Sequence, residues 1–185
     1  YSDSFFLHSA CSYDHELAIM SLGLTMSAFT YKNDGDEHAR KALHAIGCDD
    51  RTIESFRFDD QQSCADSCGY IIAAKKLPDD TFLIPVVIRS HCYGGEWVSN
   101  AHAVEEAYPD HAVGFKAAAD GVYDAVTDYL DRRGFDLGRV KLWLCGYSRG
   151  GAVTNLLGAR FTFESGIGKD NIFAYSFATP VTVFD

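Results

Sequence analysis

The sequence predicts an α/β protein with a mixed, mostly parallel sheet that carries helices on both faces. Helix-period and strand-like segments alternate through the second half of the chain: a helix at 114–134, a strand at 139–145, a helix at 149–164 and a strand from 171. Parallel strands need long crossover connections, which helices usually supply. A second observation is a serine between two glycines, placed where the strand at 139–145 becomes a helix.

The N-terminal half predicts a helical cover followed by a hairpin. The segments 14–31 and 36–48 each place apolar residues at helical spacing, and Gly47 ends the second helix. The apolar runs at 70–76 and 81–89 are separated by a Pro-Asp-Asp turn, so we expect them to pair antiparallel. The expected organisation is a single domain over 1–185, with the helical cover at 14–47 and the sheet and elbow core at 69–185.

Composition excludes several classes of function. The 185 residues have a formal net charge of −10, which argues against nucleic-acid binding and against electrostatic docking to anionic lipid. Any contact with lipid would therefore have to be apolar. No apolar window of about 18 residues predicts a transmembrane segment. The chain starts at Tyr1 rather than Met, so we expect a processed or excised fragment, and the missing signal sequence leaves the compartment open.

The cysteines do not predict a metal site or a disulfide scaffold. Six cysteines are dispersed along the chain, without the paired spacing of a zinc site. Cys64 and Cys68 are close enough for a local disulfide in an exported protein, or for free thiols otherwise, and both alternatives stay open. Cys145 is interpreted as buried strand packing. No metal and no cofactor is expected.

The stretch "GYSRGG" at 146–151 predicts a nucleophile. Gly146 and Gly150 flank Ser148 in the G-x-S-x-G pattern, whose strained turn needs neighbours without side chains so that strand and helix approach closely. The backbone amide of Arg149 would then lie at a helix N-terminus, where it favours a developing oxyanion. The alternative is that Ser148 merely caps the helix. A positive φ at Ser148 would distinguish the two.

The order of several short motifs resembles the class 3 (fungal-type) lipases of the α/β-hydrolase superfamily, in particular their bacterial lipase-like branch. The motifs are "VVIRS", "GEW", "GF", "GYSRGG" and "FATP". The resemblance covers nearly the whole chain. It implies a carboxylic-ester hydrolase that forms an acyl-enzyme on Ser148, acts on an acyl-ester or lipid substrate and uses no cofactor. It also weakly favours an extracellular or bacterial cell-surface location. By position, the amide of His91 is implied as the second oxyanion donor.

The sequence departs from the family pattern at two of these motifs. Ser90 and His91 stand where the family has Gly followed by Ser or Thr, which makes the second oxyanion donor uncertain between His91 and its neighbours. "FATP" replaces the family's "GSP" with a bulkier pair. Tyr93 and Trp97, in the loop that follows Ser90 and His91, suggest either a lid that faces lipid or aromatic rings that seal the core beneath the loop.

The catalytic acid and base are the larger gap. Seven histidines all precede Ser148, whereas the family order is nucleophile, acid, histidine. Asp170 and Asp185 are the aspartates that follow Ser148, and Asp170 should lie at the opposite end of the sheet. We therefore expect the chain to be truncated after the strand that follows the elbow, leaving that strand at an open edge through which it could associate. His91 and His102 are the upstream histidines that could substitute.

Two hypotheses of different class follow. The first is the nucleophile-bearing portion of a lipase-type or esterase-type hydrolase of lipid metabolism, lacking its triad aspartate and histidine. The second is an inactive hydrolase-like domain used for binding. Thioesterases, acyltransferases and peptidases share the same elbow, so the substrate class depends on the resemblance.

Overall fold

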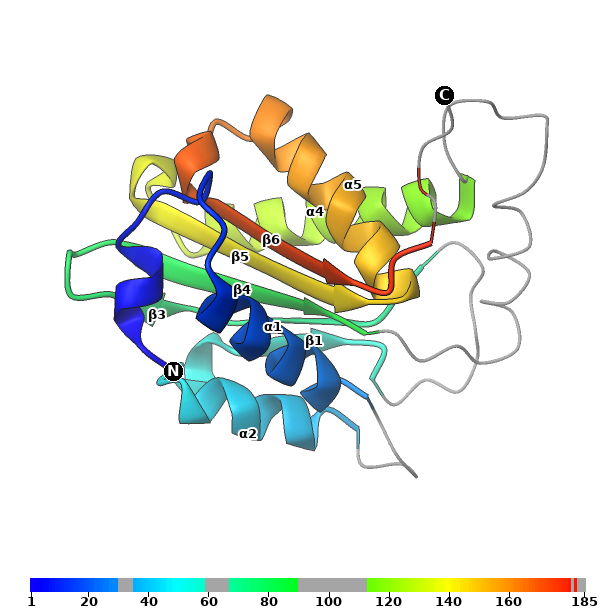
Figure 1. Ribbon diagram of the computed structural model, residues 1–185, viewed down its shortest axis with the longest axis horizontal. Helices are drawn as coiled ribbons and strands as arrows, with labels where there is room; N and C mark the ends of the chain where they lie inside the picture. Colours follow the sequence, from blue (N-terminus) through cyan, green and yellow to red (C-terminus); the bar gives the residue numbers. More distant parts are fainter. Residues whose placement is uncertain (30–34, 59–66, 90–112, 181, 183–185) are drawn as a thin grey trace.

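A computed structural model describes residues 1–29, 35–58, 67–89, 113–180 and 182 of the chain. Within these residues, six strands form one mixed sheet in the order β1-β2-β4-β5-β6, with β3 paired to β4 (Figure 1). The strands are β1 (Glu54–Phe56), β2 (Tyr70–Ile72), β3 (Lys75–Lys76), β4 (Phe82–Ile88), β5 (Val140–Tyr147) and β6 (Ile172–Phe177). The longest ladders, β4 with β5 and β5 with β6, are parallel, as predicted.

The antiparallel hairpin is confirmed, with an interruption. Both β2 and β3 pair antiparallel with β4 in one continuous register, in which Ile72 faces Val86 and Lys75 faces Leu83. Between them Ala73 donates to the carbonyl oxygen of Pro85 at 3.1 Å. Proline has no N–H to return that bond, so the ladder breaks and the expected strand 70–76 becomes two short strands.

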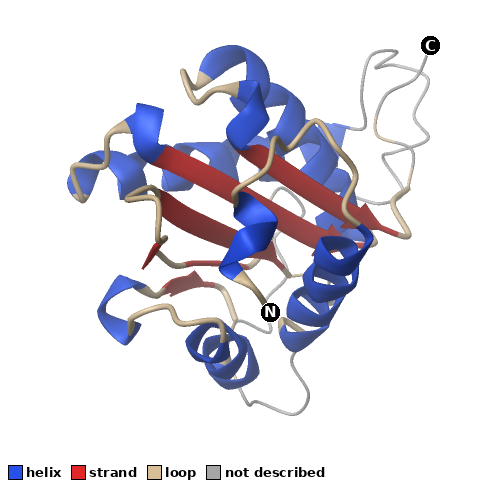
Figure 2. Ribbon diagram, turned by 60° about the vertical axis from the view of Figure 1, so that its left-hand side comes forward, coloured by secondary structure: helices blue, strands red, loops and turns tan. Residues whose placement is uncertain are grey.

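Both faces of the sheet are buried, and alternate residues of each strand face opposite layers. On β5, Trp143 and Cys145 pack with α1 (His15–Ser27) and α2 (Glu37–Ala45), whereas Leu142 and Leu144 pack with the other helices. Those helices are α4 (Val113–Arg132) and α5 (Arg149–Glu164). Figure 2 shows helices on both sides of the sheet. This confirms the predicted fold class.

The first helix is shorter than the sequence predicts. Asp14 caps its N-terminus by accepting a hydrogen bond from the Leu17 amide at 2.9 Å. The helix ends at Ser27, whose hydroxyl donates to the Leu24 carbonyl at 2.6 Å, and Ala28 is the C-cap. The predicted extension to residue 31 is therefore wrong for Ala28 and Phe29. The second helix ends at Ala45 and Gly47 follows with a φ of 93°.

The N-terminal segment is held to the sheet by a buried lysine. The Lys141 ammonium donates to the Phe6 carbonyl and to the Asp79 carboxylate, at 2.5 and 2.8 Å. Phe6 belongs to the short 3₁₀ helix η1 (Asp3–Phe6), and its ring packs 5.1 Å from that of Trp143. None of the helices described is long and apolar enough to cross a bilayer.

Candidate active site

Ser148 lies at the turn between β5 and α5 in a strained conformation. Its φ is 52° and its ψ is −119°, whereas residues other than glycine rarely adopt a positive φ. Its side chain makes no capping hydrogen bond to α5. An ordinary N-cap has extended dihedrals and a side-chain bond to the helix, so the capping alternative is excluded. The positive φ predicted from the G-x-S-x-G pattern is confirmed.

The glycines on either side explain how the turn is held. A Cβ at Gly146 would overlap the carbonyl group of Gly150 and lie 2.6 Å from Thr154 Oγ1. The last residues of β5 therefore touch the first turn of α5 backbone to backbone, an approach that any side chain at Gly146 would block. Thr154 Oγ1 in turn donates to the Gly150 carbonyl at 2.8 Å.

The neighbouring strand supports the same turn. The Ser148 amide donates to the Phe177 carbonyl at 2.8 Å, which extends the β5–β6 ladder through the elbow. Just beyond, Ala178 has a φ of 47° and is, like Ser148, a non-glycine residue with a positive φ. A Cβ at Gly151 would lie 2.7 Å from Thr179 Oγ1. The segment "FATP" therefore fits beside the elbow with backbone strain at Ala178. The sequence indicated that this segment is bulkier than the family's "GSP", but it did not predict the strain.

Arg149 is buried behind the serine. Its side chain is 1% exposed, and its guanidinium lies 5.4 Å from the centroid of the Phe115 ring on α4. That contact connects the first turns of α4 and α5. The backbone of Arg149 begins a helix of 16 residues, so its amide lies at the positive end of the helix dipole. The sequence pattern indicated a role for the Arg149 backbone, and it did not predict the burial of the charge.

The described histidines make no hydrogen bond to Ser148 within the described part of the chain. The Nδ1 atom of His15 shares a hydrogen bond of 3.4 Å with the Tyr13 hydroxyl. The Nε2 atom of His44 lies 3.3 Å from the Asp50 carboxylate. His8, His15, His38 and His44 all come from the N-terminal segments, and no hydrogen bond between described residues joins any of them to the Ser148 hydroxyl. His91, His102 and His111 lie outside the described residues, as do Tyr93 and Trp97.

Asp170 is at the far end of the sheet, as predicted. It belongs to the 3₁₀ turn η5 (Lys169–Asn171) before β6, where Ser9 donates to its carboxylate at 2.5 Å. That hydrogen bond is the main cause that lowers the pKa of Asp170. The ladder from Ile172 to Phe177 separates it from the elbow by about 17 Å of strand. Asp170 anchors the N-terminal segment, and Asp185 lies outside the described residues.

The cysteine predictions have different outcomes. Cys145 is fully buried beneath the elbow, and burial raises the pKa of its thiol to about 12, which confirms its interpretation as strand packing. Cys68 is also buried. Cys64 lies outside the described residues, so the choice between a Cys64–Cys68 disulfide and free thiols stays open.

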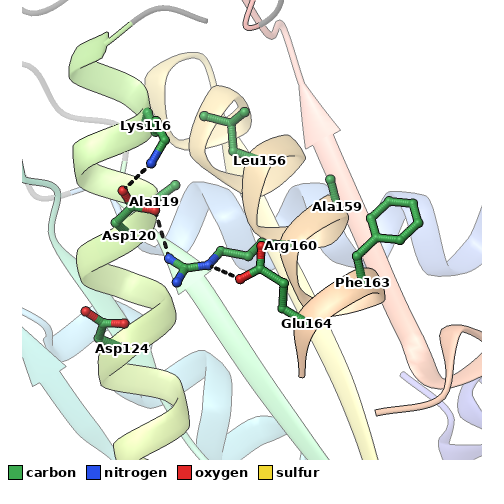
Figure 3. Close-up of a pocket in the computed structure, with 9 residues that line it drawn as sticks. All are labelled: Lys116, Ala119, Asp120, Asp124, Leu156, Ala159, Arg160, Phe163 and Glu164. Atoms are coloured by element: carbon green, nitrogen blue, oxygen red, sulfur yellow. Dashed lines mark hydrogen bonds and ion pairs between the residues drawn. The ribbon is translucent and has the colours of Figure 1, made fainter. Parts of the chain in front are cut away.

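One groove in the described part of the chain does not include the serine. It has a volume of about 590 Å³ and lies between α4 and α5, which line it with their side chains (Figure 3). Its charged walls bond to one another: Asp120 binds Lys116 and Arg160, and Arg160 also binds Glu164, at 2.7 to 2.8 Å. The pair between Arg160 and Asp120 joins the two helices, and Ser148 does not line the groove.

Comparisons with known proteins agree with this architecture. No family model and no curated protein matches the sequence. Among solved structures, a fungal lipase–inhibitor complex matches with a TM-score of 0.56 at 17% identity, over 93% of this chain and 65% of its own. A Rhizomucor miehei lipase–propeptide complex matches with a TM-score of 0.55 at 18% identity, over 93% of this chain and 54% of its own. The extracellular lipase LipA from Serratia marcescens matches with a TM-score of 0.53 at 14% identity, over 94% of this chain and 39% of its own.

These similarities establish the fold as the α/β-hydrolase-like fold seen in lipases. At 14–18% identity they do not extend to activity or substrate. The chain spans less than two thirds of each of these three structures.

Proposed function

We propose that this chain is the nucleophile-bearing portion of a serine carboxylic-ester hydrolase of lipase or esterase type. The observation that carries the proposal is the backbone of Ser148, strained at a φ of 52° between a parallel strand and a helix. Strain of this kind costs about 1–3 kcal/mol and persists where the surrounding structure imposes it, often at active sites. The lipase-like fold supports an ester or lipid as substrate.

The proposed reaction passes through an acyl-enzyme. Ser148 Oγ attacks the ester carbonyl and gives its proton to a general base, and the carbonyl oxygen becomes an oxyanion. The amide of Arg149 donates to that oxyanion, with His91 or a neighbour as the second donor. The alcohol leaves with the proton, and water then hydrolyses the acyl-enzyme and restores the hydroxyl.

The acid and base are proposed to come from chain that follows Asp185. Every histidine of the sequence precedes Ser148. Among the described residues β6 is paired on one side alone, by β5, which leaves an edge that could accept further strands. Strands added parallel to β6 would end at the same edge of the sheet as the elbow, where an acid and a base are needed.

The test compares hydrolysis of a p-nitrophenyl ester by two lengths of the protein. The 185-residue chain should hydrolyse it barely above background, since a serine without a base is a weak nucleophile. The full product of the gene should be far faster, and Ser148→Ala should abolish the difference. A fully active 185-residue chain whose activity is lost in Ser148→Ala would assign the base to an upstream histidine, which His91→Ala and His102→Ala would identify.

The same assay also tests a second candidate function, that of an inactive binding domain. The Ser148 hydroxyl makes no hydrogen bond to a described histidine, which is also what an inactive, hydrolase-like binding domain would have. If both lengths are inert toward esters of different acyl length, the binding domain is the better account. Activity on thioesters or peptides instead would place the chain among the related serine acyl hydrolases.

A further inference from the structure

The side chain that follows the candidate nucleophile carries a charge where its neighbours are apolar. Arg149 is 1% exposed, and its guanidinium lies 5.4 Å from the centroid of the Phe115 ring, which is equally buried. Phe115 belongs to a small apolar cluster with Ala152 and Leu156. An uncharged side chain would fill such a site without the cost of moving a guanidinium out of water. Core packing alone therefore does not explain an arginine at this position.

The place of Arg149 within α5 is also unfavourable for a cation. Arg149 is the first residue of the helix and lies at the positive end of the helix dipole, where acidic side chains are favoured. The first turns of α1 and α2 follow that rule, with Glu16 and Glu37, whereas the first turn of α5 has no acidic residue. Proteins break local rules of this kind mainly at functional sites.

The contact with Phe115 restrains the first turn of α5. Backbone contacts already hold the neighbours of Arg149: the Ser148 amide is bonded to β6, and Gly150 touches Gly146. Phe115 lies in the first turn of α4, which packs beside α5 on the same face of the sheet (Figure 1). A cation within about 6 Å of an aromatic ring is attracted to its face. The Arg149 side chain thus ties its own backbone to a second helix.

We propose that the Arg149 side chain, held by the Phe115 ring, is a positioning residue for the Arg149 amide. The inference rests on the proposed function, in which that amide donates to the oxyanion. Such a donor must lie about 2.7–3.1 Å from the place that the oxyanion takes, and a displacement of about 1 Å can lower the rate about 100-fold. The amide moves with the first turn of α5, and the side chain limits that motion.

The experiment compares hydrolysis of a p-nitrophenyl ester by the full gene product and by its Arg149→Met variant, in which a flexible, uncharged side chain replaces the cation. Acylation and deacylation both pass through an oxyanion, so kcat and kcat/KM should fall together by about 10–100-fold while KM is unchanged. Arg149→Lys retains a cation for the ring, so it should lower kcat by about threefold at most.

A second measurement separates positioning from a loss of folded protein. A trifluoromethyl ketone forms an adduct with Ser148 that carries the oxyanion, so its Ki should rise in Arg149→Met by the factor by which kcat falls. A smaller fraction of folded protein would lower the apparent kcat and leave this Ki unchanged.

Phe115→Leu tests the same contact from the other helix, since it removes the ring and leaves Arg149 in place. It should also lower kcat and raise the Ki. The double variant should be no slower than Arg149→Met, because both changes break one contact. Lys116→Met is the matched control, since it removes a charge from the adjacent, exposed position of α4, where Lys116 binds Asp120 at 2.7 Å. It should leave kcat and the Ki unchanged.

Three results would each overturn the inference: an unchanged Ki in Arg149→Met, a double variant whose loss is the product of the two single losses, or an equal loss in Lys116→Met. If Arg149→Met does not fold, the Ki of Phe115→Leu decides in its place. A full gene product without hydrolysis that depends on Ser148 would refute the proposed function, and this inference with it. Hydrolysis that depends on Ser148 and is unaffected in the Arg149 variants would refute this inference alone.

Discussion

Replacing Gly146 with alanine should force the elbow apart. The new Cβ would overlap the Gly150 carbonyl and approach Thr154 Oγ1 to 2.6 Å, about 1 Å closer than the usual contact of about 3.5 Å. The Gly150 carbonyl belongs to the backbone of the first turn of α5, so that clash is relieved by moving the helix and not by rotating a side chain. Overpacking of a core typically costs about 1–3 kcal/mol, and we expect the upper end, about 3 kcal/mol.

Urea unfolding followed by circular dichroism measures this cost. With a slope of about 1–3 kcal/mol per molar urea, Gly146→Ala should lower the midpoint by about 1–3 M. Gly121→Ala is the control, because a Cβ there meets nothing within 4 Å on α4. It should stabilise the protein by up to about 1 kcal/mol through lower entropy of the unfolded chain. Equal midpoints for the two variants would refute the close approach of β5 to α5 and with it the elbow geometry.

Three further predictions concern the surroundings of the elbow and the sheet. Ala178→Gly should stabilise the protein by about 0.5–1 kcal/mol, since glycine adopts a φ of 47° without strain. In contrast, Ala159→Gly, at an exposed position of α5, should destabilise it by about 1 kcal/mol; thermal unfolding that ranks the two variants the other way would contradict this. Ser21→Ala should cost about 1–3 kcal/mol, because it leaves the buried Trp143 Nε1 without its acceptor at 2.8 Å; a loss no larger than that of the half-buried Ser27→Ala, by urea unfolding, would refute the hydrogen bond. Burial opposes ionisation of Asp79, yet the hydrogen bonds from Lys141 and Thr81 prevail and lower its pKa from 3.8 to about 2. The ionised carboxylate therefore stabilises the fold fully above about pH 4, and this stabilisation is lost as the pH falls toward 2. Asp79→Asn should flatten the dependence of unfolding free energy on pH in that window, and an unchanged acid profile would count against the ion pair.

The parallel half of the fold could be predicted because its sequence pattern has one interpretation. β5 and α5 are long, their periodicities differ, and two glycines mark the junction at Ser148. Here local sequence and tertiary structure require the same conformation, since a strained turn between a parallel strand and a helix needs small flanking residues.

One prediction failed, and two features were not predicted, where a single residue or a distant contact outweighs periodicity. Pro85 breaks the strand expected at 70–76, although its missing N–H acts on the partner strand and not on its own. Ala178 adopts a positive φ that nothing in "FATP" announces, because the strain is imposed by packing against the elbow. Arg149 is buried and its guanidinium contacts Phe115, which is 34 positions earlier in the chain and comes close through the fold alone.

Covalent trapping of Ser148 tests the central proposal most directly. The full gene product is treated with a fluorophosphonate, which forms a stable adduct with an activated serine, and digested with trypsin. Cleavage after Lys141 and Arg149 releases the peptide 142–149, "LWLCGYSR", in which Ser148 is the one serine. The proposal predicts the adduct on this peptide, together with loss of ester hydrolysis in proportion to labelling. Loss of hydrolysis with the adduct on another serine, or hydrolysis that persists in Ser148→Ala, would contradict it.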